Sequence, residues 1–244
     1  MCVNPVAPAG YRGKELEVIE YHADRAICEH IEDVRGMFGA DCEIYALGFS
    51  LGSNHLLRHL GSHKDCDKLC RIKAAVSISG AFEIPANTIT LRNKVFGIYD
   101  WYMMSHLQKL FAQRCFKQQH ADEKYNLIGE NAVNIMDFDG LVRGRMFGMN
   151  SGHMLHRKVS CNQFVPGIQT PLFLVYAKDD SITDFKFVPL EDLARNKSII
   201  TAVIPKGGHC DFFYPGKSRH KELPPKLALD YFDKVQEYER MLKS

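Results

Sequence analysis

The sequence has no long hydrophobic run, no large surplus of charge and no regular cysteine pattern. Its 244 residues contain no stretch of about 18 apolar residues, so no transmembrane helix is predicted within them. The opening residues, MCVNP, lack the basic region and apolar core of a secretory signal. Lys and Arg number 31 against 29 Asp and Glu, spread along the chain, which argues against a nucleic-acid-binding protein. A cytoplasmic or membrane-associated protein is expected.

The eight cysteines are scattered without the spacing of a disulfide framework, which predicts reduced thiols. One group, His63, Cys66 and Cys70, is spaced like half of a zinc site. No second pair follows at ligand spacing, and a structural zinc ion needs four ligands. We therefore predict a loop with two free thiols there.

The apolar residues predict one α/β domain spanning residues 1–244. Four short apolar runs, at 44–47, 74–78, 172–176 and 199–204, are almost continuous, as in strands covered on both faces. Apolar residues recur every three to four positions in 19–38 and again in 227–242, which predicts two amphipathic helices. Pro224 and Pro225 suit the first turn of the second helix. Strands that alternate with helices predict a parallel sheet.

A stretch of almost ninety residues, about 82–168, has no strong strand signal and is predicted to be a helical insertion. We expect it to form a lid over the carboxyl edge of the sheet. It is rich in aromatic residues, which more often form the core of such an insertion, although a few could line an apolar ligand pocket. They include Phe96, Tyr99, Trp101, Tyr102, Phe111 and Phe116.

Residues 48–52 (GFSLG) match the pattern G-x-S-x-G directly after the strand predicted at 44–47 and before an apolar helix. In a strand–turn–helix of this kind two glycines allow a tight turn, and the serine hydroxyl projects at the edge of the sheet. Ser50 is therefore a candidate nucleophile. The backbone N–H of Leu51, at the helix N-terminus, could stabilise an oxyanion. The alternative is a glycine-rich turn with an incidental serine.

A nucleophilic serine needs a base and an acid that orients the base. Asp179 and Asp180 follow the strand predicted at 172–176, and His209 follows the one at 199–204 after two glycines. The carboxyl ends of parallel strands share one edge, so these residues could converge on Ser50. Either aspartate could instead cap a loop. Most of the eleven histidines are expected to be solvated, and His153, His156 and His220 lack the preceding strand that favours His209.

Several motifs together resemble the AB hydrolase 4 family of α/β-hydrolase-fold esterases and lipases. They are GFSLGSN and LLRHLG at residues 48–54 and 56–61, Phe138-Asp139, Phe147-Gly148, Pro171 and Gly207-Gly208-His209. The similarity runs from about residue 1 to 215. It implies Ser50 as nucleophile, Asp180 as acid and His209 as base. It also implies carboxylic esters as substrates, such as acylglycerols or phospholipids, and no metal or organic cofactor.

The family fold places four strands before the strand that leads to the nucleophile, whereas only 49 residues precede Ser50 here. Residues 1–4 and 11–13 resemble the end of the fourth strand and its turn, so we expect a hydrolase domain that lacks its N-terminal strands and leaves a sheet edge open. Three functions follow as hypotheses. They are a serine esterase or lipase with peripheral membrane contact through the lid, a non-catalytic remnant that binds an apolar ligand or partner, and an alcohol O-acyltransferase with the same triad.

Overall fold

The protein is described by a computed structural model, which covers residues 23–62, 71–117, 131–144, 148–210, 212 and 223–243. The chain divides into two compact units, Met1–Phe82 with Cys161–Ser244, and Glu83–Ser160. The segments predicted as the end of a fourth strand, at 1–4 and 11–13, lie outside the described residues. So do the three residues of the zinc-like pattern.

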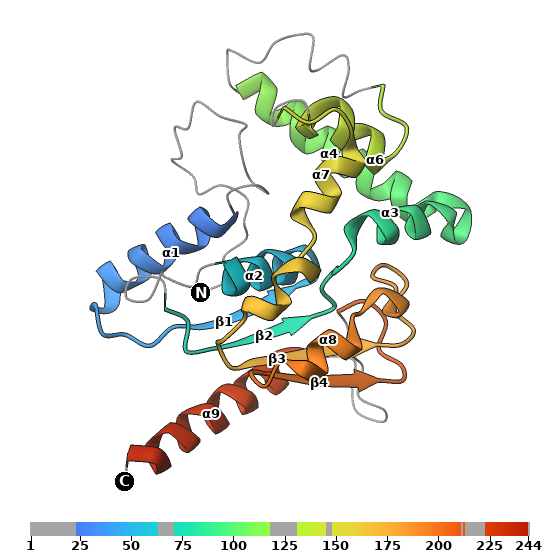
Figure 1. The fold of residues 1–244 in the computed structure, drawn as a ribbon. Helices are drawn as coiled ribbons and strands as arrows, with labels where there is room; N and C mark the ends of the chain where they lie inside the picture. The colour runs from blue at the N-terminus through green and yellow to red at the C-terminus, as the bar shows by residue number, and fades with distance from the viewer. Residues whose placement is uncertain are drawn as a thin grey trace. The chain divides into compact units, whose positions relative to one another are not determined.

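The first unit contains a parallel sheet of four described strands in the order β1-β2-β3-β4 (Figure 1). Each strand forms at one of the predicted apolar runs, which confirms the α/β fold class. Tyr45 lies opposite Ala74 at one side of the sheet, and Leu172 lies opposite Ile199 at the other. The bounds are Tyr45–Phe49 for β1, Ala74–Ile78 for β2, Leu172–Ala177 for β3 and Ile199–Ile204 for β4.

Burial differs between the inner and the outer strands. Every residue of β2 is buried, as are five of the six residues of β3. Most residues of β1 and β4 are partly or fully exposed, and each of these strands pairs on one side only within the described part of the chain. The prediction of strands covered on both faces is therefore wrong for β1 and β4, because a continuous apolar run does not distinguish an inner strand from an outer one.

Helices pack on both faces of this sheet, and alternate strand residues point to opposite faces (Figure 1). Leu174 and Tyr176 share one core with Leu57 of the helix that follows β1. Val175 and Val76 share the other core with Ala228 of the C-terminal helix. The helices of this unit are α1 (Ala23–Phe38), α2 (Ser50–Ser62), η3 (Asn162–Gly167), η4 (Phe185–Phe187), α8 (Leu190–Arg195) and α9 (Leu223–Lys243).

The described residues of the second unit form helices and connecting turns and no strand, in keeping with the missing strand signal. Its role as a lid stays a prediction. No described helix of either unit has an apolar stretch long enough to cross a bilayer. The described elements of the second unit are α3 (Ile84–Asn93), η1 (Lys94–Gly97), α4 (Ile98–Lys117), α6 (Ile135–Phe138), the π-helical turn η2 (Asp139–Gly144) and α7 (Gly152–Val159).

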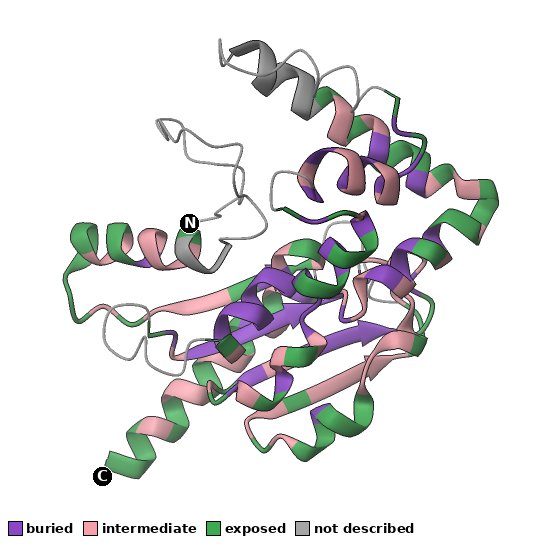
Figure 2. Cartoon of the chain, turned by 45° about the horizontal axis from the view of Figure 1, so that its top comes forward, coloured by how far each residue is buried: buried purple, intermediate pink, exposed green. Residues whose placement is uncertain are grey.

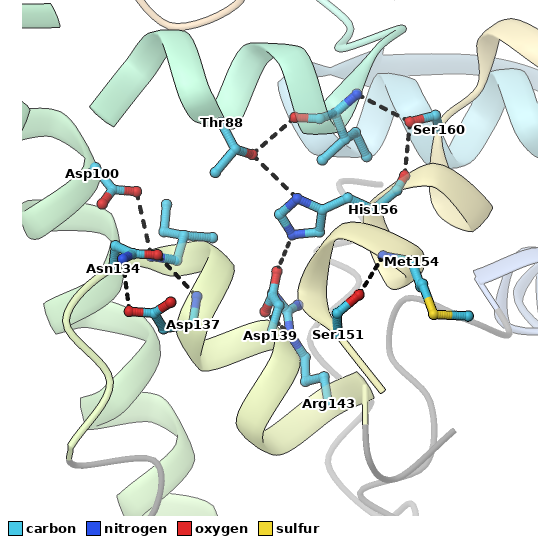
Figure 3. Close-up of polar contacts among 12 residues, drawn as sticks. Thr88, Asp100, Asn134, Asp137, Asp139, Arg143, Ser151, Met154, His156 and Ser160 are labelled. Carbon is cyan, nitrogen blue, oxygen red and sulfur yellow. Dashed lines mark hydrogen bonds and ion pairs between the residues drawn. The ribbon is translucent and has the colours of Figure 1, made fainter. Parts of the chain in front are cut away.

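A buried polar network joins three elements of the second unit (Figure 3). The Asp139 carboxylate accepts hydrogen bonds from Arg143 and from Nε2 of His156. The other ring nitrogen of His156 lies 3.4 Å from the Thr88 hydroxyl. Burial raises the pKa of Asp139, but the charges and hydrogen bonds of Arg143 and His156 outweigh it and hold that pKa below its usual value. His156 is only 3% exposed, so it is not one of the solvated histidines that are expected to be the majority.

Candidate active site

Ser50 lies at a sharp turn between β1, which ends at Phe49, and α2, which begins at Ser50. Its φ of 49° is in the left-handed region, which residues with a Cβ rarely adopt. A Cβ on Gly48 would lie 2.8 Å from Cα of Ser53, so only glycine allows strand and helix to approach this closely. A Cβ on Gly52 would meet no described atom within 4 Å. The prediction that both glycines serve the tight turn is therefore wrong for Gly52.

The loop after β4 carries His209 and is held by Asp179. Oδ1 of Asp179 accepts hydrogen bonds from the backbone N–H groups of Gly207, at 2.8 Å, and Gly208, at 2.9 Å. These two bonds lower the pKa of Asp179. Gly208 has a φ of 63°, and a Cβ on Gly207 would overlap the ring of Phe212. The two glycines and Asp179 thus fix the path of the chain into His209.

Asp180 lies in the turn after β3 and is 4% exposed. Its Oδ1 accepts from the N–H groups of Ile182, at 2.8 Å, and Thr183, at 2.9 Å. Its Oδ2 accepts from the Thr183 hydroxyl at 2.6 Å and from Nδ1 of His209 at 2.9 Å. Burial raises the pKa of Asp180, but the hydrogen bonds from His209, Thr183 and Ile182 outweigh it and lower that pKa. Asp180 is therefore a buried, ionised acceptor.

His209 connects Asp180 to Ser50. Its Nδ1 donates to Asp180, because an ionised carboxylate can only accept, and its Nε2 lies 2.8 Å from Oγ of Ser50. With the proton on Nδ1, Nε2 is free to accept the hydroxyl hydrogen of Ser50. Burial lowers the pKa of His209, but hydrogen bonds and charges of Asp180 and Cys210 outweigh it and raise that pKa to about 9.

The structure brings the three predicted side chains together at the carboxyl ends of β1, β3 and β4. Leu51 is the second residue of α2, where backbone N–H groups lack partners within the helix. A hydroxyl, an imidazole and a carboxylate in such a chain can activate the hydroxyl as a nucleophile. Thr183 is not among the residues predicted from the sequence, although an aspartate followed by threonine three residues later is a known pattern for local side-chain hydrogen bonds.

Comparisons with known proteins give the class of this fold. No family model matches the chain. The chain is 27% identical over 189 residues to an abhydrolase domain-containing protein of Dictyostelium discoideum, covering 77% of this chain and 46% of that protein. It is 24% identical over 188 residues to a monoacylglycerol lipase of Saccharomyces cerevisiae, covering 75% of this chain and 41% of the lipase. The chain thus spans less than half the length of both relatives.

Among solved structures, an acylaminoacyl peptidase in complex with a chloromethyl ketone aligns with a TM-score of 0.50 at 17% identity. The alignment covers 86% of this chain and 27% of the peptidase. At this identity the likeness concerns the fold alone, and it agrees with the parallel sheet and the strand–turn–helix at Ser50. The chain therefore has an α/β-hydrolase fold.

Proposed function

We propose that the protein is a serine hydrolase that cleaves carboxylic esters, with Ser50 as nucleophile, His209 as base and Asp180 as the orienting acid. The observation that carries the proposal is the continuous chain of hydrogen bonds from Ser50 through His209 to Asp180 at three strand ends. The left-handed backbone of Ser50 supports it, because strained residues gather at functional sites.

In the first half of the reaction, Oγ of Ser50 attacks the ester carbonyl carbon while Nε2 of His209 takes the hydroxyl proton. Asp180 stabilises the imidazolium that forms, and the Leu51 N–H stabilises the oxyanion. The tetrahedral intermediate then breaks its bond to the alcohol oxygen, which receives the proton from His209. An acyl group remains on Ser50.

In the second half, a water molecule attacks the acyl group and gives a proton to His209. The second intermediate releases the carboxylic acid, and His209 returns the proton to Oγ of Ser50. An alcohol in place of water would make the protein an acyltransferase. Adding ethanol to the assay separates the two outcomes, because an ethyl ester forms only by transfer.

We propose lipid esters as the substrates and residues 82–168 as a lid that contacts a membrane peripherally. Two observations support this substrate class. A relative is named a monoacylglycerol lipase, and the described residues of the second unit expose several large apolar side chains. No step of the proposed reaction requires a metal ion or an organic cofactor.

The proposal is tested by reacting the purified chain with a fluorophosphonate probe and mapping the adduct by mass spectrometry. We expect one adduct on Ser50, lost in His209→Ala. Ser181→Ala provides a matched control, because Ser181 lies beside Asp180 but makes none of the proposed contacts, and it should keep the adduct. A folded chain that takes no probe would contradict the proposal and favour a non-catalytic protein that binds an apolar ligand or partner.

A further inference from the structure

The second unit carries a dense group of exposed apolar side chains around the turn from α3 to α4. Phe96 is fully exposed, at 102%, and Trp101 and Tyr102 are 61% and 57% exposed, so the prediction that these aromatics form the core of the insertion is wrong. We call the group the α3–α4 knuckle. It consists of Ile89, Val95, Phe96, Ile98, Trp101 and Tyr102.

Several residues in the first turns of α4 are exposed (Figure 2), and these exposed residues are apolar. Ile98, Trp101 and Tyr102 are three and four positions apart and so share one exposed face. The opposite face holds Asp100, which is 3% exposed and accepts a hydrogen bond from the Ile135 N–H at 3.4 Å (Figure 3). An ordinary surface helix places its carboxylates in water and its aromatic rings inside. This arrangement is the reverse of the ordinary one and suits contact with an apolar environment.

The backbone of the knuckle is strained at Val95 and at Phe96, its most exposed residue. Val95 and Phe96 have φ values of 48° and 54°, in the left-handed region. That conformation is rare for any residue with a Cβ and rarer for a β-branched residue such as valine. Strain of this kind persists where it serves a function. Here it accompanies the full exposure of the Phe96 ring.

The charges around the knuckle indicate which kind of surface it contacts. Residues 84–109 contain three cations, Arg92, Lys94 and Lys109, and one anion, Asp100. Since Asp100 is buried, every exposed formal charge in this range is positive. An apolar apex with Trp and Tyr beside it and cations around it is the composition that enters the interface of an anionic lipid bilayer.

We propose that the α3–α4 knuckle inserts into the surface of anionic membranes, with Phe96 as the apex and Arg92 and Lys94 on the lipid head groups. This inference rests on the proposed function in one respect: the membrane is the surface on which the protein would find its lipid ester substrates. Binding itself requires no chemistry at Ser50. Membrane binding and catalysis can therefore fail separately.

Trp101 is the only tryptophan of the chain, so its fluorescence reports on the knuckle directly. The full chain is titrated with vesicles of phosphatidylcholine, with and without phosphatidylserine. We expect a blue shift of the emission with the anionic vesicles and a much weaker one with the neutral vesicles. Ser50→Ala should bind equally well. If Ser50→Ala also abolishes ester turnover, binding and chemistry are separated.

Two variants test the two parts of the knuckle. Phe96→Ser should weaken partitioning about tenfold or more, because it removes the burial of one aromatic side chain. Arg92→Glu combined with Lys94→Glu should weaken partitioning into anionic vesicles about tenfold or more and leave neutral vesicles unaffected. The matched control is Tyr238→Ser with Leu242→Ser on α9, where two apolar residues are 63% and 70% exposed. That control should bind as the unchanged chain does.

Three results would overturn the proposal. The first is a folded chain whose tryptophan emission does not respond to anionic vesicles. The second is binding that Phe96→Ser and the charge reversals leave unchanged. The third is a blue shift that grows with protein concentration without lipid and disappears in Phe96→Ser, because the knuckle would then join copies of the chain.

Discussion

Two groups of side chains in this molecule have the same chemistry and different surroundings. Ser50, His209 and Asp180 lie in the first unit, and Thr88, His156 and Asp139 lie in the second. Each group has a hydroxyl next to one nitrogen of a histidine and a carboxylate next to the other. Both also follow the chain order of hydroxyl, acid and histidine. Residue types and their order therefore do not separate a candidate catalytic group from a structural one.

The surroundings do separate them. The Thr88 hydroxyl donates to the Ile84 carbonyl at 2.9 Å, closer than its 3.4 Å contact with His156, so its hydrogen is already used. Asp139 also binds Arg143, and the His156 side chain is 3% exposed. His209 is 19% exposed and lies 2.8 Å from a serine on a strained turn. A triad needs a hydroxyl free to give its proton and open to a substrate.

The largest difference between the groups should come from their hydroxyls. Ser50→Ala should lower kcat for a short-chain p-nitrophenyl ester by a factor of about 10⁵ to 10⁶, because the nucleophile is lost. Thr88→Val should leave kcat per folded molecule within about twofold, as befits a structural hydroxyl. Initial rates normalised by circular dichroism would measure both. A large loss of kcat in a folded Thr88→Val variant would contradict the distinction between a catalytic and a structural hydroxyl.

The two carboxylates should differ in what their loss impairs. Asp180→Asn should lower kcat by a factor of about 10⁴, because the histidine loses its orienting partner. Asp139→Asn should instead lower the free energy of unfolding by about 3–5 kcal/mol, since it leaves Arg143 and His156 without their buried anion. Urea denaturation and ester turnover of both variants test this contrast. Equal effects of both substitutions on kcat would contradict it.

The pH dependence follows from the raised pKa of His209, about 9 against 6.5 for the free side chain. His209 acts as a base only when neutral, so kcat/KM should rise as the pH approaches 9 and then level off. A raised pKa stabilises the fold below pH 6.5, and this contribution is lost as the pH rises through 9. Activity should therefore rise in the range in which the stability from His209 falls.

Rates and urea midpoints across pH 6–10 measure both trends. Asp180→Asn removes the carboxylate charge that raises the pKa of His209, so the midpoint of its residual rate should move to lower pH. A midpoint that stays in place would mean that Asp180 does not act on His209. Asp139 adds the opposite dependence of stability on pH in the acid range. Because the fold lowers the pKa of Asp139, the stabilisation from this residue is lost as the pH falls below 3.8, the usual pKa of an aspartate.

The sequence predicts those features that depend on local pattern. The four strands are found because their apolar runs are short and bounded, and the strand ends then place Ser50, Asp180 and His209 at one edge. The buried Asp139–His156 pair and the exposed aromatic rings of α4 are not predicted from the sequence, because both depend on which face of a helix meets another element. Periodicity marks a face without saying where that face points.

The smallest predicted effect concerns Thr183, a positioning residue in the turn beside Asp180. Its hydroxyl lies 2.6 Å from Oδ2 of Asp180, the same oxygen that accepts from His209, and 3.3 Å from the carbonyl oxygen of Ser79. Thr183→Val removes the hydroxyl and keeps the size of the side chain. We expect kcat to fall about tenfold and KM to stay within about twofold, because the carboxylate loses one charge-assisted hydrogen bond while no substrate contact changes.

The conservative and control variants decide whether the effect is one of positioning. Thr183→Ser retains a hydroxyl and should recover most of kcat, whereas Thr201→Val, on β4 and away from the triad, should change neither constant. Had Thr183 only a packing role, Thr183→Ser would lose more stability than Thr183→Val and recover no rate, since it deletes the methyl group and keeps the oxygen. A positioning role therefore predicts that Thr183→Ser is the more active of the two variants, whereas a packing role predicts that it is the less stable one and no more active. The second unit offers the reference, because Thr88→Ser and Thr88→Val should differ in stability and not in kcat.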